Sequence, residues 1–517
     1  MKSYNPTLFN YNESPDEISY SPVSSDLSVQ NVSLENSATI SGDFDGDGKM
    51  DFIMYPTTGN DAKRKYWVFS DITSNINTNL AIQHPVGAFE DIVSVSFLTE
   101  SGILAPMQGW NIITRNNATN TTTFTTYAKD PIISGSILQQ YNKSYEFPKL
   151  IYYNELPSGC TQPRPPVKVE KTIPKKYLSG DFNGDGLTDI IIVEQDHDYI
   201  RNGFYNEQGQ SQPIIEIHEG CNACTQQAQL PPITETYFGQ AYLLNLDPRI
   251  STNYVIDAGQ LNTTKDDKVF VADFNGDGKS DIYIFSEGYL KVYTLNDQNQ
   301  FIILYENTVA DSNIVLDKTI LMGDYNGDGK SDFIIPKGFN TTNYTKFIST
   351  GKSFVTTNEY YNTMPYNQSI NNKIFHYIAT DINNDGKTDI ISVKTFKGSD
   401  GTSQGGLISI RIHENMIADF ISEIFIDTFQ ENILAYPVPI FLSSDKLNKN
   451  LEISFISGNK IHHFQSKKDF NKDKLLSSVI TGNGVTESIT YLPLDKNAIQ
   501  DGNAIYTPSG YTENYPN

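Results

Sequence analysis

The length, composition and charge of the chain exclude several classes of protein. At 517 residues it exceeds an ordinary single-core domain, so several domains, a very large barrel or a repeat architecture is expected. Hydrophobic residues make up 38% and aromatic residues 12%, which is enough for a packed core and argues against disorder throughout. A net charge of −23 argues against nucleic acid or an anionic membrane surface as partner, and favours a cation as counter-charge.

Residues 1–37 are interpreted as an extension or linker ahead of the first repeat. They contain no charged segment followed by an apolar segment, so no secretion signal is recognisable. No run in the chain approaches the roughly 18 to 20 apolar residues of a membrane-spanning helix.

One acidic motif recurs along the chain, and each copy runs directly into a short apolar strand. The five copies are SGDFDGDGKMDFIMY at 41–55, SGDFNGDGLTDIIIV at 179–193, VADFNGDGKSDIYIF at 271–285, MGDYNGDGKSDFIIP at 322–336 and ATDINNDGKTDIISV at 379–393. We number the nine-residue loops within them from the first (43–51) to the fifth (381–389).

Each loop carries the oxygen ligands that Ca²⁺ prefers. Asp or Asn stands at positions 1, 3, 5 and 9, and the backbone carbonyl of position 7 is the expected fifth protein ligand. In chain order, the five predicted ligand sets are Asp43, Asp45, Asp47, Lys49, Asp51; Asp181, Asn183, Asp185, Leu187, Asp189; Asp273, Asn275, Asp277, Lys279, Asp281; Asp324, Asn326, Asp328, Lys330, Asp332; and Asp381, Asn383, Asp385, Lys387, Asp389. The sequence therefore predicts about five structural Ca²⁺ sites. The first loop, with four carboxylates rather than three plus an amide, is expected to bind most tightly.

Two alternatives to this reading are weaker. A generic Asx-rich turn would explain one copy, but not five with a fixed ligand spacing. EF-hands and dockerin-like loops begin with the same pattern, but they need an acidic ligand at position 12 and flanking helices. Here position 12 is apolar or Ser, and the flanking segments are β-branched or aromatic.

The five segments resemble the FG-GAP or VCBS repeats of integrin α-chain heads and of many bacterial surface and toxin proteins. That resemblance implies an all-β fold, a β-propeller in which each repeat is one four-stranded blade. It also implies that the calcium loop joins adjacent strands of a blade and that the hydrophobic residue at position 2 packs inward. The likeness spans roughly residues 40–465.

Spacing between the loops indicates how many blades there are. The third, fourth and fifth loops are one blade apart, whereas the gap after the first is too long for one blade. Residues 91–114 are interpreted as a blade whose loop has decayed, and residues 440–464 as another, with Asp445, Asn448 and Glu452 as remnants. Seven blades are expected within a propeller spanning 38–470, or six if 91–114 is only an insertion.

Two irregular insertions, at about 130–176 and 203–240, are candidate partner-binding loops. They contain all three cysteines, which suggests that the insertions touch. Cys160 could form a disulfide with Cys221 or Cys224. The less favoured alternative is a zinc site made of Cys160, His218, Cys221 and Cys224.

Residues 471–517 are expected to begin a following domain that is truncated in this chain, because a Gly-Asn-Gly turn within 475–495 predicts a hairpin. This segment resembles the one that follows the propeller in SpvB-like and insecticidal toxin-complex B-subunit proteins, which lead into Rhs/YD-repeat shells. No catalytic motif emerges, so no enzyme activity is expected. Two functions remain open: an exported binding or scaffold module of a toxin or shell protein, and an integrin-like or lectin-like adhesion module at the cell surface, with a protein or glycan partner on one propeller face.

Overall fold

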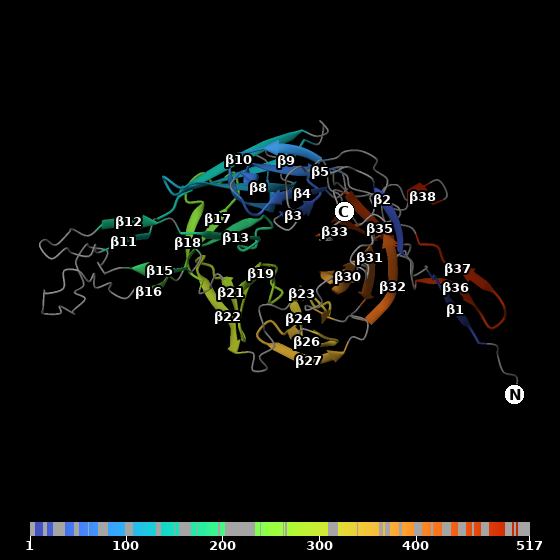
Figure 1. The fold of residues 1–517 in the computed structure, drawn as a ribbon. Coiled ribbons are helices and arrows are strands. Elements are labelled where there is room, and N and C mark those ends of the chain that lie inside the picture. Colours follow the sequence, from blue (N-terminus) through green and yellow to red (C-terminus); the bar gives the residue numbers. More distant parts are fainter. Residues whose placement is uncertain are drawn as a thin grey trace, which may run out of the picture.

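Seven antiparallel sheets of four strands each make up most of the described part of the computed structural model (Figure 1). The fold is therefore all-β and has the seven blades expected for a β-propeller. The structure describes residues 6–504 apart from 14–17, 24–36, 46–50, 60, 71–80, 99–106, 131–135, 149, 155–166, 172, 195–196, 202–232, 238, 262, 264–265, 309–318, 339, 361–365, 368–372, 382–384, 398–405, 415–416, 427–435, 443–450, 458–459, 467–474, 492–498 and 501–502.

The blades follow one another along the chain. Blade 1 consists of β3 (Ser37–Gly42), β4 (Asp51–Pro56), β5 (Lys65–Phe69) and β6 (Ala81–Pro85), with a 3₁₀ turn, η2 (Ala62–Arg64), before β5. Blade 2 consists of β7 (Phe89–Phe97), β8 (Met107–Asn116), β9 (Thr121–Lys129) and β10 (Ile137–Glu146). Blade 3 consists of β13 (Lys175–Gly180), β14 (Asp189–Glu194), β17 (Gln240–Asn245) and β18 (Val255–Gln260).

The second half of the ring repeats this order. Blade 4 consists of β19 (Lys268–Ala272), β20 (Asp281–Ser286), β21 (Tyr289–Leu295) and β22 (Phe301–Thr308). Blade 5 consists of β23 (Leu321–Gly323), β24 (Asp332–Pro336), β26 (Asn343–Ser349) and β27 (Phe354–Tyr360). Blade 6 consists of β29 (Lys373–Thr380), β30 (Asp389–Lys397), β31 (Gly406–Glu414) and β32 (Ile417–Ile426).

Blade 7 is built from both ends of the chain. Its strands β33 (Tyr436–Leu442), β34 (Leu451–Ser457) and β35 (Lys460–Ser466) are joined by the N-terminal β2 (Ile18–Val23), which pairs antiparallel with β35. Part of the segment expected to be an extension or linker therefore supplies the fourth strand of a blade. This strand was not predicted from the sequence, because a single strand far along the chain from its partner carries no repeat motif.

A small sheet continues this pairing of the two ends. The predicted C-terminal hairpin is present as β36 (Leu476–Ile480) and β37 (Thr486–Ser488), and β1 (Leu8–Tyr11) pairs with β36. Two further short pairs are β25 (Asn340–Thr341) with β28 (Tyr366–Asn367), and β38 (Ile499–Gln500) with β39 (Asn503–Ala504).

Burial within a blade explains the composition of its strands. First strands of neighbouring blades contact one another, as β3 and β7 do, and so lie nearest the ring centre. Second strands such as β14 and β20 are buried along nearly their whole length, because both faces of a blade are covered by its neighbours. Fourth strands such as β27 lie at the rim and are largely exposed. The apolar runs IIIV and IYIF are therefore second strands.

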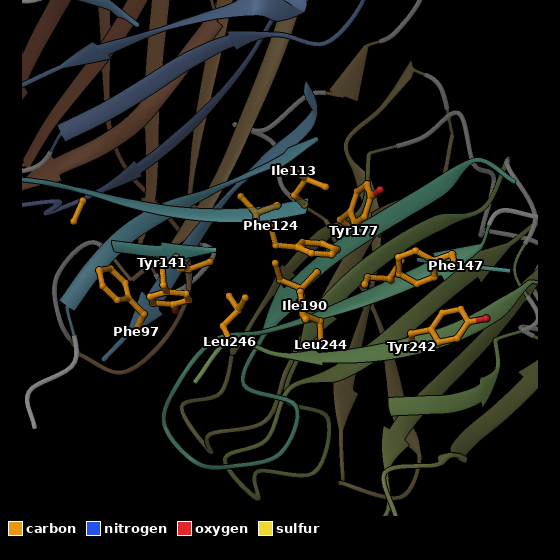
Figure 2. Packing of buried hydrophobic residues seen from close by; sticks show 14 residues of the cluster. Phe97, Ile113, Phe124, Tyr141, Phe147, Tyr177, Ile190, Tyr242, Leu244 and Leu246 are labelled. Carbon is orange, nitrogen blue, oxygen red and sulfur yellow. The ribbon is translucent and has the colours of Figure 1, made fainter. Parts of the chain in front are cut away.

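The core consists of side chains packed between successive blades. Figure 2 shows the cluster between blades 2 and 3, where Phe124 lies at the edge of the Tyr177 ring and Phe147 at that of Tyr242. Residues 91–97 lie within β7 and residues 107–114 within β8, so this segment belongs to a blade and is not an insertion.

Both insertions leave the ring as paired strands. One hairpin is β11 (Leu150–Asn154) with β12 (Val167–Lys171), and the other is β15 (His197–Arg201) with β16 (Ile233–Tyr237). They project from the same side of the ring (Figure 1). The first insertion begins later than expected, because residues 137–146 form the rim strand β10. This strand was not predicted because most of its residues are polar. No helix within the described ranges is long and apolar enough to cross a membrane.

Candidate metal centre

All five acidic loops join the first strand of a blade to the second, in one register. The residue before the loop pairs with position 9, as Gly42 pairs with Asp51 and Ala272 with Asp281. The same pairing recurs in the second, fourth and fifth loops. Position 9 is therefore the first residue of the buried second strand. In the second to fourth loops, where every residue is described, positions 1 to 8 form the turn between the strands.

The second, third and fourth loops share one hydrogen-bond scheme, seen clearly in the third. The carboxylate of Asp273 accepts from the backbone N–H of Gly276 at 2.7 Å and of Gly278 at 2.9 Å. Asp281 Oδ2 accepts from the Phe274 N–H at 2.9 Å. The two glycines have φ values of +75° and +84°, a conformation that residues with a Cβ rarely adopt. These bonds hold the acidic side chains together at one side of the turn.

The buried position 9 carboxylates fit a cation in this turn. Asp189 Oδ2 and Asp281 Oδ1 are buried and accept no hydrogen bond, an arrangement that is costly unless a positive charge lies nearby. Burial, together with the charge of Asp185, raises the pKa of Asp189 to about 8. Burial also raises the pKa of Asp281 and of Asp332 to about 6. A bound Ca²⁺ would hold these groups ionised.

The first loop differs from the others. Asp43, Asp45 and Asp51 offer oxygens that all lie within 4.8 Å of one another, a group that could hold a metal ion. The ammonium of Lys129, at the end of β9 in blade 2, forms an ion pair with Asp45 and lies 3.0 Å from Asp51 Oδ1. Burial lowers the pKa of Lys129, but the hydrogen bond to Asp45 and the charge of Asp51 together raise it above its usual value.

Neighbouring loops are also joined across blades. Position 8 of one loop donates its backbone N–H to the carbonyl of position 1 in the loop before it, as Ser280 does to Asp181 at 2.7 Å and Ser331 to Asp273 at 2.6 Å. Thr388 bonds Asp324 in the same way at 2.6 Å. The second to fifth loops therefore form one continuous row.

Some predicted residues lie outside the described part of the chain. These are Asp47, Lys49 and Asn383 among the calcium ligands, Asp445 and Asn448 among the remnants of a decayed loop, and Cys160, His218, Cys221 and Cys224 among the disulfide or zinc candidates. The calcium sites, the disulfide and the zinc alternative all stay predictions. Sequence reasoning missed Lys129, which lies 78 residues after its partner Asp51 and in a blade without the motif.

Comparison with known proteins agrees with the repeat assignment. Residues 273–335, from the third loop through the fourth, match the family described as FG-GAP-like repeat. The described fold and this match together define a β-propeller that contains FG-GAP-like repeats. None of the curated proteins matches the chain.

Several solved structures are similar at low identity. An Agrocybe aegerita lectin, in a structure describing recognition of non-reducing terminal N-acetylglucosamine, is 14% identical with a TM-score of 0.37, covering 75% of this chain and 80% of that one. BBS1N in complex with ARL6DN is 8% identical with a TM-score of 0.40, covering 87% and 97%. TcdB2-TccC3 is 10% identical with a TM-score of 0.21, covering 78% and 27%. Likeness at this level does not bear on function.

Proposed function

We propose that this chain is a calcium-stabilised propeller that binds a macromolecular partner and has no catalytic turnover of its own. The observation that carries the proposal is one turn that recurs in consecutive blades and gathers acidic side chains around a buried position 9 carboxylate. One oxygen of that carboxylate accepts no hydrogen bond in two of these turns, namely Asp189 Oδ2 and Asp281 Oδ1. Each such turn joins the two innermost strands of a blade, so an ion there stabilises the packed core rather than a surface loop.

Thermal melting in calcium and in chelator tests the structural role of the metal. Each site that binds only the folded state adds about 2.7 kcal/mol of stability when calcium is present at a hundred times Kd. The melting midpoint should therefore fall by many degrees when a chelator replaces calcium, whereas Mg²⁺ at the same concentration should restore little of it. An unchanged midpoint would contradict a structural role.

The partner surface of the proposal is formed by the hairpins β11–β12 and β15–β16. Both hairpins leave the ring on one side, and residues 155–166 and 202–232 separate their paired strands. Loops placed on a rigid scaffold are common recognition surfaces. The partner is proposed to be a protein or a glycan. Because the acidic side chains of the repeats are assigned to metal binding, the hairpins are the surface that we assign to partner contact.

Shortening the hairpins tests this assignment. Residues 155–166 or 202–232 would be replaced by a short Gly-Ser turn. Residues 71–80, which join the paired strands β5 and β6, would be replaced by the same turn as a control. Loss of binding on a glycan array or to a candidate protein, with calcium-dependent melting retained, supports the surface, because each blade contacts mainly its neighbours. Equal loss in the control variant contradicts it.

Two biological settings are compatible with this module, which we propose to be exported. The segment at 475–495 favours an SpvB-like or toxin-complex setting, in which the propeller docks a toxin or shell subunit. The alternative is an adhesive cell-surface head. The gene beyond residue 517 distinguishes them, since YD repeats support the first and a membrane anchor or sorting domain supports the second.

A further inference from the structure

The first loop already contains a positive charge supplied by the chain itself. The Nζ atom of Lys129 pairs with Asp45 and donates to both oxygens of Asp51, at 3.0 and 3.1 Å. Its side chain is only 4% exposed, and that of Asp51 is fully buried. The Lys129 backbone N–H also donates to the Phe44 carbonyl at 3.2 Å, which anchors the lysine against the loop.

The third loop provides a natural comparison. Ser349 ends the third strand of blade 5, as Lys129 ends the third strand of blade 2, and each contacts the loop of the preceding blade. The Ser349 hydroxyl donates to the Phe274 carbonyl at 2.7 Å, the counterpart of the Phe44 carbonyl that accepts from the Lys129 backbone N–H. The Ser349 backbone N–H donates instead to Asp332 Oδ1 of its own blade, at 2.7 Å. Serine fills this position without adding a charge to the loop.

An ammonium and a calcium ion cannot both use the same oxygens. Ca²⁺ requires six to eight oxygen ligands at about 2.3 to 2.6 Å, and Asp45 and Asp51 are both hydrogen-bonded to Lys129. For calcium to bind, a buried lysine would have to leave its carboxylate partners and move out of the interface between blades 1 and 2, which is unfavourable.

We propose that Lys129 is the built-in cation of the first loop, so that Asp45 and Asp51 are neutralised without calcium while the other four loops bind the metal. The inference deepens the proposed function and rests on the calcium sites of the other loops. It also reverses the expectation that the first loop, with its four carboxylates, binds most tightly. The contact between blades 1 and 2 is then independent of the calcium concentration.

The test counts bound calcium ions in the whole chain by equilibrium dialysis and calorimetry. Wild type should bind four ions. Lys129→Ser, which gives the first loop the side chain found at the third, should bind five. Asp43→Ala, which removes the position 1 carboxylate present in all five loops, should leave the wild-type count at four, but should return the Lys129→Ser variant from five to four. Five ions in wild type, falling to four with Asp43→Ala, would overturn the proposal.

A reciprocal exchange keeps the inference testable if Lys129→Ser does not fold. Ser349→Lys should remove one ion from the third loop, giving three, and an unchanged count of four overturns the inference. Failure of the proposed function has a different signature, because wild type would then bind no calcium. In that case one ion bound by Lys129→Ser supports the role given to Lys129 in the first loop, and none overturns it.

Discussion

A substitution of Phe274, at position 2 of the third loop, tests core packing separately from metal binding. Its side chain is fully buried between blades 4 and 5. The ring lies 5.2 Å from that of Phe354 and 6.1 Å from those of Tyr283 and Tyr305. Its backbone N–H donates a hydrogen bond to Oδ2 of Asp281, the first residue of β20. Phe274→Ala therefore removes the packing and keeps the hydrogen bond to the loop.

The expected loss of unfolding free energy is about 3 to 5 kcal/mol, the usual range for truncating a buried Phe to Ala. Urea denaturation in saturating calcium measures it. Ile303→Ala in the same blade is the control, because Ile303 is 47% exposed on the rim strand β22 and its loss should stay within about 0.5 kcal/mol.

Calcium affinity should change less than about threefold in Phe274→Ala, since the backbone donor to Asp281 remains. A stability loss below about 1.5 kcal/mol would refute the packing argument. A tenfold loss of calcium affinity, equal to about 1.4 kcal/mol, would refute the separation of core from loop.

Two further predictions concern the contact between loops and the response to pH. Gly323→Ala places a Cβ 2.4 Å from Thr388 Cγ2, so the unfolding free energy measured by urea denaturation should fall by about 1 to 3 kcal/mol. Gly338→Ala is the control, because the nearest atom to its Cβ is 3.8 Å away, and its unfolding free energy should hardly change. Equal losses in the two variants would contradict the clash. Burial lowers the pKa of His84, so the unfolded chain takes up the proton first and the stability contribution present above about pH 6.5 is lost as the pH falls. His84→Gln should therefore lose less melting temperature than wild type between pH 7.5 and 5.5, and parallel losses would exclude this role.

The sequence alone determined the elements that are local and repeated. The loops, the apolar second strands after them and the turn glycines lie within about fifteen residues of one another, so their spacing was readable. With two decayed copies counted, it predicted seven blades, or six if 91–114 was an insertion, and the structure has seven. The C-terminal hairpin was predicted for the same reason, since its turn and both strands, β36 and β37, are contiguous.

Tertiary structure decided the features that depend on closing the ring. The pairing of β2 with β35 joins residues from opposite ends of the chain, and Lys129 reaches the first loop from another blade. The rim strand β10 is recognisable only once β9 is beside it. In each case the partner is distant in the chain, and a single sequence records which residues are present but not which distant ones the fold brings into contact.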